Sequence, residues 1–182
     1  MKLFKNSLLT VITLVAIHGC GGSGGSGGGG GEAAPKTPAQ AVAQLEAQGK
    51  IPSNLDRGNT LAGIDADGNG IRDDVDAHIL KLSAVQQPIA RQTARAVQAE
   101  ILVDKTNIQA VREAALKSTK AVRCSHFRFP ANNAEDGKLR RQVLSEIVSI
   151  TTDTKPRLLA YLALSKALDG TVSVGLTGDT CE

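Results

Sequence analysis

The spacing of the apolar residues constrains the fold of this chain more than any other feature. From residue 75 to residue 168, apolar side chains recur three and four positions apart, which is the period of helices that bury one face. Aromatic residues are scarce: after the first 20 residues the chain contains only Phe127, Phe129 and Tyr161. A core must therefore be built from Leu, Ile, Val and Ala. The sequence predicts an all-α fold, a small helical bundle.

Each predicted helix has one face that we expect to point into the core. In chain order, these faces consist of Val75, Ile79 and Leu82; of Ile89, Thr93, Ala96, Val97, Glu100 and Ile101; of Ile108, Val111, Ala115 and Val122; of Leu139, Val143, Ile147 and Ile150; and of Leu158, Leu159, Leu162 and Leu168. Asn107 and Thr154 are expected to cap the third and last of these helices, and Gly170 to end the last. A short helix around residues 38–48 is expected to precede them.

An acidic segment of twelve residues, from position 65 to position 76, comes directly before the first of these faces. Side-chain oxygens occur at its first, third and fifth places, a glycine at its sixth, and carboxylates at its ninth and twelfth, a spacing that can wrap one hard cation in oxygen. The expected calcium ligands are the side chains of Asp65, Asp67, Asn69, Asp73 and Asp76 and the backbone carbonyl of Ile71. The alternative is a turn in which Asp73 and Asp74 only favour a helix N-terminus.

This segment resembles the calcium loop of EF-hands, and more closely the loops of thrombospondin type 3 repeats and dockerins, which read D-x-D-x-[DN]-G-x-x-D-x-x-D. The resemblance covers about twelve residues and implies calcium binding only. Asp76 stands where EF-hands have a closing Glu, and Arg72 stands where paired EF-hands have an aliphatic residue. Gly58 and Gly63 would interrupt an entering helix. We therefore expect a solitary loop followed by one helix, not half of a sensor pair.

The N-terminus predicts export. Lys2 and Lys5 precede an apolar run over residues 8–17, about half of the ~20 residues that a spanning helix needs, so residues 1–19 are interpreted as a signal peptide. Without the two lysines, 19 Lys and Arg face 18 Asp and Glu in the rest of the chain. A body so nearly neutral argues against a nucleic-acid partner.

The segment Ile17-His18-Gly19-Cys20 resembles the lipobox of bacterial lipoproteins. The resemblance implies that Cys20 carries diacylglycerol and becomes the mature N-terminus; the alternative is a free or disulfide-bonded cysteine in a soluble secreted protein. Because Gly21 and not Asp follows the cysteine, we expect a lipid anchor in the bacterial outer membrane, with the protein on its periplasmic or surface face. Residues 20–37 are then a Gly-rich flexible tether, and residues 38–182 form the helical domain.

Two further cysteines, Cys124 and Cys181, are expected to form a disulfide in an oxidising compartment. The alternative is a pair of reactive thiols, but no C-x-x-C sequence supports it. Val172, Val174 and Leu176 alternate with polar residues, so the C-terminal tail is expected to lie extended across the bundle.

A basic and aromatic segment begins at His126 and is predicted to form a loop up to about Gly137. It is interpreted either as a contact surface for an anionic partner, such as lipid headgroups or cell wall, or as a loop whose phenylalanines pack into the bundle. No residue pattern identifies a catalytic site. We expect an envelope-anchored calcium-binding lipoprotein that is a non-enzymatic structural or interaction module. The alternatives are a calcium-regulated protein that binds an envelope partner and a cell-wall-acting enzyme of unrecognised type.

Overall fold

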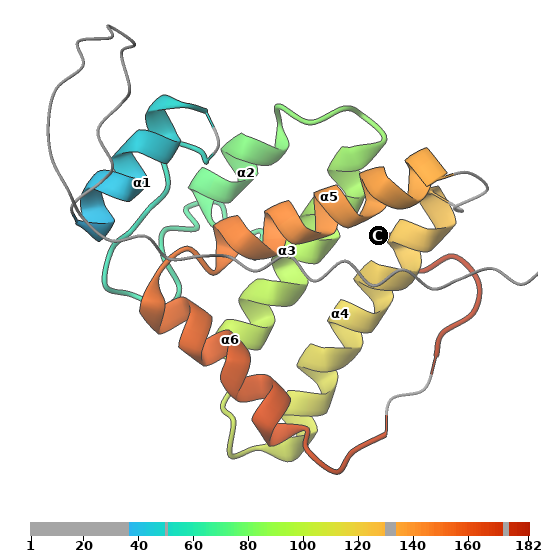
Figure 1. Cartoon of the computed structure of the whole chain (residues 1–182). Coiled ribbons are helices and arrows are strands. Elements are labelled where there is room, and N and C mark those ends of the chain that lie inside the picture. The colour runs from blue at the N-terminus through green and yellow to red at the C-terminus, as the bar shows by residue number, and fades with distance from the viewer. Residues whose placement is uncertain (1–36, 50, 130–133, 173–174) are drawn as a thin grey trace, which may run out of the picture. The chain divides into compact units, whose positions relative to one another are not determined.

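The computed structural model describes residues 37–49, 51–129, 134–172 and 175–182, and within these ranges every regular element is a helix. The helices are α1 (Pro38–Ala47), α2 (Asp73–Ile79), α3 (Gln86–Leu102), α4 (Ile108–Arg128), α5 (Ala134–Thr151) and α6 (Lys155–Ala167). The predicted all-α helical bundle is confirmed (Figure 1). The predicted signal peptide, Cys20 and most of the predicted tether lie outside the described residues.

Helix α3 is the centre of the bundle, because α2, α4, α5 and α6 all contact it. A larger core cluster joins the loop before α2 to four helices and consists of Ile71, Val75, Ile79, Ile89, Ala90, Ala94, Cys124, Val143, Ile147 and Ile150. A smaller cluster joins α4 to α6 through Val111, Ala114 and Leu164. The sequence predicted the α3 face in full, since all six of its expected residues are buried.

Helix termini also follow the sequence. The side chain of Asn107 accepts a hydrogen bond from the Ala110 amide at 3.1 Å at the start of α4, and Thr154 caps α6 in the same way. Gly170 follows α6 with φ 75°, a left-handed conformation that glycine adopts without strain. The loop predicted from residue 126 to about residue 137 is wrong at both ends, because α4 continues to Arg128 and α5 begins at Ala134.

The α6 face was predicted wrongly. Leu158, Leu159 and Leu162 are exposed, and α6 instead buries Arg157 and Leu164, while Leu168 packs against the smaller cluster as expected. The α4 face is also shifted: Val111 is buried as expected, but Ile108 and Val122 are exposed and Ala114, Ala121, Cys124 and Ser125 are buried.

The C-terminal tail crosses α3 and α4 without forming a regular element. The Gln92 side chain donates to the Thr180 carbonyl at 2.8 Å, the Thr180 hydroxyl donates to the Lys120 carbonyl at 2.7 Å, and Arg123 donates to the Gly178 carbonyl at 2.9 Å. These polar contacts hold the tail where the sequence suggested alternating apolar contacts. Val172 is 91% exposed, and Val174 lies outside the described residues.

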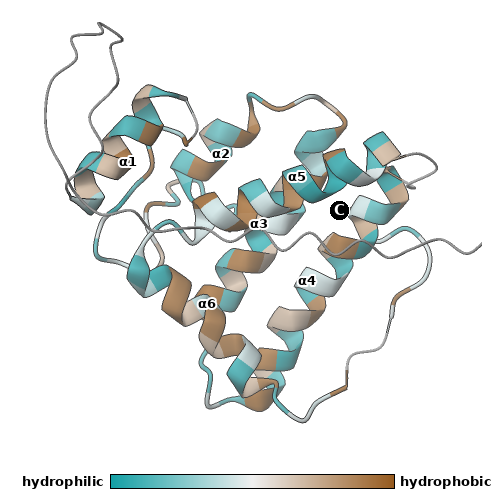
Figure 2. Ribbon diagram, viewed as in Figure 1, coloured by the Kyte–Doolittle hydropathy of each residue, from teal (hydrophilic) through white to brown (hydrophobic). Residues whose placement is uncertain are grey.

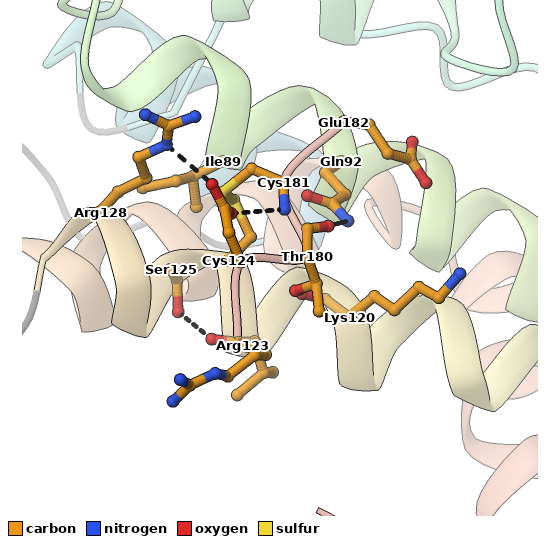
Figure 3. Close-up of a disulfide and its surroundings, with 12 residues drawn as sticks. Ile89, Gln92, Lys120, Arg123, Cys124, Ser125, Arg128, Thr180, Cys181 and Glu182 are labelled. Carbon is orange, nitrogen blue, oxygen red and sulfur yellow. Dashed lines mark hydrogen bonds between the residues drawn. A yellow bond between two sulfur atoms is a disulfide. The ribbon is translucent and has the colours of Figure 1, made fainter. Parts of the chain in front are cut away.

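A disulfide fixes the end of the tail. Cys124 of α4 bonds to Cys181, with their Cα atoms 4.7 Å apart, and Cys124 is fully buried in the larger core cluster (Figure 3). Arg128 donates a hydrogen bond to the Cys181 sulfur at 3.3 Å. The bond therefore joins the tail to the same core that holds α2, α3 and α5.

Among the described residues, no helix is both long enough and apolar enough to cross a membrane.

Candidate metal site

The acidic loop is anchored to the bundle from within. Ile71 is buried in the larger core cluster, only two residues from the exposed Asp73. At the end of the loop, the Asp73 amide donates to the Ile64 carbonyl at 2.8 Å, and α2 begins at Asp73. The loop is thus closed at its base and continues directly into a helix, as the sequence predicted.

Three of the predicted ligands converge at the surface of this loop. Asp65, Asp67 and Asp73 each present a carboxylate oxygen, and these three oxygens lie within 4.8 Å of one another. All three residues are exposed to solvent. A calcium ion binds oxygens at about 2.3–2.6 Å, so two oxygens on opposite sides of it lie about 5 Å apart. One ion can therefore contact all three carboxylates.

Backbone amides of the loop hold two of these carboxylates in place. The Asp65 carboxylate accepts from the Asn69 amide at 3.1 Å and from the Gly70 amide at 2.9 Å, and Asp67 also accepts from the Asn69 amide. Gly68 and Gly70 have φ of 70° and 80°, the left-handed conformation that lets the chain turn around the carboxylates. The loop is therefore folded around the acidic cluster by its own backbone.

The third carboxylate comes from across the loop. Asp73 accepts from the Ala66 amide at 3.0 Å, which brings the first turn of α2 against the start of the loop. The Asn69 side chain donates to Asp67 at 2.9 Å and accepts from the Ile71 amide at 2.8 Å. Asn69 thus lies beside the cluster, at the position where the sequence predicted a ligand.

The carboxylates near this loop fall into two groups. Asp56, Asp74, Asp76 and Asp153 each form an ion pair with an arginine. Within the described part of the chain, none of the three clustered carboxylates is paired with a Lys, Arg or His side chain. Three like charges are therefore held close together without a basic partner, although four arginine-paired carboxylates lie nearby in the fold.

Asp76, the predicted closing ligand, is not part of the cluster. It accepts a hydrogen bond from Arg91 of α3 and forms an ion pair with it. The structure therefore brings together three of the predicted ligands, places Asn69 beside them, buries the Ile71 side chain in the core and directs Asp76 to another helix.

Arg72 lies behind the loop and is fully buried, with its side chain 0% exposed. All five of its N–H groups donate: two to the Asp74 carboxylate at 2.8 and 2.7 Å, one to Asp153 at 3.1 Å, and one each to the carbonyls of Ile150 and Thr151 at 3.2 Å. Buried guanidinium groups are tolerated only when paired in this way. Arg72 therefore fastens the loop to the end of α5.

Arg157 forms a second buried cluster of bonds beside the first. It donates to the carbonyls of Asp56, Thr60 and Leu61 and to the carboxylates of Asp56 and Asp153. One oxygen of Asp153 thus accepts from both buried arginines. The segment from residue 56 to residue 61 is in this way joined to the start of α6.

Charge pairing shifts the ionisation of this network in a consistent direction. Burial alone raises the pKa of Asp74, but the hydrogen bonds from Arg72 and from the Asp56 amide outweigh it, so the pKa lies below the ordinary value of 3.8. Burial alone lowers the pKa of Arg72, but Asp74 and Asp153 reverse this and raise it. Both groups are therefore ionised at neutral pH.

Local sequence patterns do not predict this arginine network. The sequence marks Arg72 only as a departure from the EF-hand pattern, and no motif singles out Arg157. A signal was present: Arg157, Tyr161, Leu164 and Leu168 also recur at helical spacing. Nothing in the spacing alone could show that this second face is the buried one.

Comparison with known proteins returned nothing: no family model matches the chain, and no curated protein or solved structure matches it.

Proposed function

We propose that the chain is a calcium-binding lipoprotein of the bacterial envelope whose helical domain is a non-enzymatic structural or interaction module. The observation that carries the calcium part is the convergence of Asp65, Asp67 and Asp73 without a basic partner. Each added carboxylate at such short range raises the repulsion between the charges, and a divalent cation reverses that cost. The oxygen-only donor set is the kind that calcium prefers over transition metals.

The remaining coordination positions have candidate donors in the loop. Asn69 adjoins the three carboxylates, and Ile71 offers its carbonyl. Asp76 would have to exchange Arg91 for the ion, directly or through a water molecule. A site that must displace an arginine from its closing carboxylate binds less tightly than one with a free closing Glu, which favours a structural role at high calcium over a sensor role.

The position of the loop supports this structural role. Ile71 and Arg72 are buried immediately beneath the cluster, and Arg72 bonds to the end of α5. An ion that holds the loop closed would therefore stabilise the packing of α2 against α5. A calcium-regulated partner contact is the second candidate, and Arg95 favours it. Its stem lies against Gly70 of the loop, and its guanidinium pairs with Glu182 of the tail at 3.1 Å, so the loop and the tail share one side chain.

The cavity beside the end of α6 gives an enzymatic role little support. One surface cavity of about 320 Å³ lies between α4, the end of α6 and the tail. Its lining contains a single titratable residue, Arg112, among the largely apolar Ala115, Leu116, Leu168 and Leu176. Acid–base catalysis needs at least one group whose pKa lies near the working pH, and this lining contains no Asp, Glu, His, Cys, Lys or Tyr.

Thermal unfolding with calcium and with a chelator tests the proposed site. A bound ion stabilises by RT ln(1 + [L]/Kd), so about 2.7 kcal/mol, or several degrees of Tm, is expected at calcium 100 times above Kd. Saturation near millimolar calcium supports the structural role, and micromolar saturation supports the regulatory one. An unchanged Tm over the whole range would refute calcium binding.

Fractionation of a bacterial host tests the anchor separately. Membrane association and processing after residue 19 are expected for the native chain, and both should be lost in Cys20→Ser. A Cys20→Ser chain that is processed at the same site and remains in the membrane would refute lipidation.

A further inference from the structure

Helix α6 exposes a continuous apolar face to solvent. Leu158, Leu159 and Leu162 are 43%, 55% and 52% exposed and lie within one turn of each other on the same side of the helix. The ribbon of α6 is accordingly mostly brown in Figure 2. We call this surface the leucine face. A run of exposed leucines on one helix differs from single exposed apolar residues, which are normal on any protein.

The leucine face cannot turn inward without breaking the fold. On the opposite side of α6, Arg157 is fully buried with all five N–H groups bonded, and Leu164 is buried against Val111 and Ala114 of α4. A rotation that buried the leucines would bring the Arg157 guanidinium out of its carboxylate and carbonyl contacts. The exposure of these leucines is therefore fixed by the same network that lies behind the acidic loop.

Two lysines extend the leucine face at its ends. Lys155 and Lys166 are exposed, lie in helical register with Leu159 and Leu162, and are about 16 Å apart along the axis at 1.5 Å per residue. In the described part of the chain neither ammonium group is paired with a carboxylate, and the sequence of α6 contains no Asp or Glu. The surface is thus apolar in the middle and positive at both ends.

This charge pattern disfavours a second copy of the chain as the occupant of the leucine face. A second copy packed antiparallel on the same face would place Lys155 of each chain beside Lys166 of the other, four ammonium groups around six leucines with no acidic residue on α6 to balance them. A flat surface that is apolar inside and carries negative charges at its boundary would complement both the leucines and the lysines at the two ends of the leucine face. We propose that the leucine face docks onto a lipid bilayer that carries anionic headgroups, with the helix axis parallel to the membrane plane.

The physical basis is that of interfacial amphipathic helices. The three leucines would enter the boundary between headgroups and acyl chains, while the lysine stems lie along it and their ammonium groups reach the phosphates. Three half-exposed leucines and two lysines bind weakly by themselves. A lipid anchor at the N-terminus makes the second contact intramolecular and raises its effective concentration. The inference therefore rests on the proposed membrane attachment.

Fluorescence gives a direct test, because the chain contains no tryptophan. The full chain carrying Leu159→Trp is reconstituted with vesicles of phosphatidylethanolamine and phosphatidylglycerol whose acyl chains are brominated. The matched control is Val122→Trp, at a 47% exposed apolar position of α4 outside the leucine face. The indole at position 159 is expected to shift to the blue and lose at least half of its emission, whereas the indole at position 122 is expected to change little.

A second set of variants removes the two positive charges at the ends of the leucine face. Lys155→Gln with Lys166→Gln, in the Leu159→Trp background, should lower the ratio of docked to free α6 about 30-fold, because each lysine near an anionic surface contributes roughly a factor of five. The control pair Lys117→Gln with Lys120→Gln, on α4, should leave the ratio nearly unchanged. Equal effects of the two pairs would overturn the role of the α6 lysines.

The outcomes separate the two proposals. Protein that floats with the vesicles while the indole at position 159 stays unquenched refutes docking but leaves the anchor intact. Protein that does not float refutes both. A dimer in sedimentation that Leu159→Ser abolishes would assign the leucine face to a second copy and would also overturn the inference.

Discussion

Gly63→Ala is the substitution that tests the arginine network most sharply. Gly63 has φ 69°, and a Cβ atom at this position would lie 2.3 Å from Cδ and 2.7 Å from Cγ of Arg72 and 3.1 Å from Nη2 of Arg157. Since carbon atoms pack no closer than about 3.5 Å, the Arg72 stem must move by more than 1 Å. Both arginines are completely buried, so neither can move without breaking hydrogen bonds.

The expected loss of stability has two parts. A left-handed conformation costs an alanine about 1–2 kcal/mol. Breaking a buried ion pair costs about 3–5 kcal/mol, and partial breakage costs some fraction of that. We therefore expect a loss of about 3–6 kcal/mol, or roughly 10–20 °C in Tm for a domain of about 150 residues. Gly170→Ala is the matched control: its φ is 75°, but an added Cβ would have no neighbour within 4 Å, so only about 1–2 kcal/mol should be lost.

Urea and thermal unfolding of the two variants measure the difference. If Gly63→Ala and Gly170→Ala lose the same stability, the arginines do not hold the segment before the loop as described. A double-mutant cycle gives a second test. Arg72→Ala should lower the free energy of unfolding much less in the Gly63→Ala background than in the native chain, because Gly63→Ala has already displaced the Arg72 side chain from its partners.

Three more substitutions test other parts of the structure. Cys181→Ser should lower the unfolding free energy by about 4 kcal/mol, since the disulfide closes a loop with a sequence separation of 57, and it should make the tail protease-sensitive; an unchanged cleavage rate would contradict this. Burial raises the pKa of Glu100 above its ordinary 4.5, so ionisation of this carboxyl lowers the stability of the folded protein as pH rises from that value through the folded pKa. The Tm of Glu100→Gln should therefore rise relative to that of the native chain between pH 4 and pH 7. A difference in Tm that stays constant over this range would count against the prediction. Asp74→Asn should destabilise the protein at neutral pH and lose this effect below about pH 3.8, because the pKa of Asp74 is lowered in the folded state and its contribution disappears as pH falls through that lowered value.

Helical spacing predicted the faces on which most of the buried residues are apolar. The α3 face and most of the α5 face are buried as expected, because an apolar stripe has one favourable place in a bundle. Helix α6 offers two stripes, and the one with more leucines is exposed. Arg157 decides the choice, since four of its five hydrogen bonds go to residues about 100 positions earlier in the chain, and no local pattern contains that pairing.

The acidic loop was predictable for the opposite reason. Its clustered carboxylates lie within the twelve-residue segment, so their convergence depends on local turns at Gly68 and Gly70 and on backbone amides that bond to Asp65 and Asp67. The exception is again long-range: the last acidic residue of the loop pairs with Arg91 on another helix. Residue spacing therefore predicted the carboxylate cluster but not the ion pair that Asp76 forms with Arg91.

Calorimetric titration of the full chain with calcium tests the central claim most directly. The native chain should bind one calcium ion. The double variant Asp65→Asn, Asp67→Asn leaves one acceptor oxygen at each position, so the side chain at position 65 can accept from the Asn69 or the Gly70 amide but not from both. It removes two charges, and it should bind no calcium while retaining its helix content. Asp169→Asn, an exposed acidic position after α6, should bind like the native chain. Calcium binding that survives in the double variant, or a native chain that binds no calcium, would contradict the account.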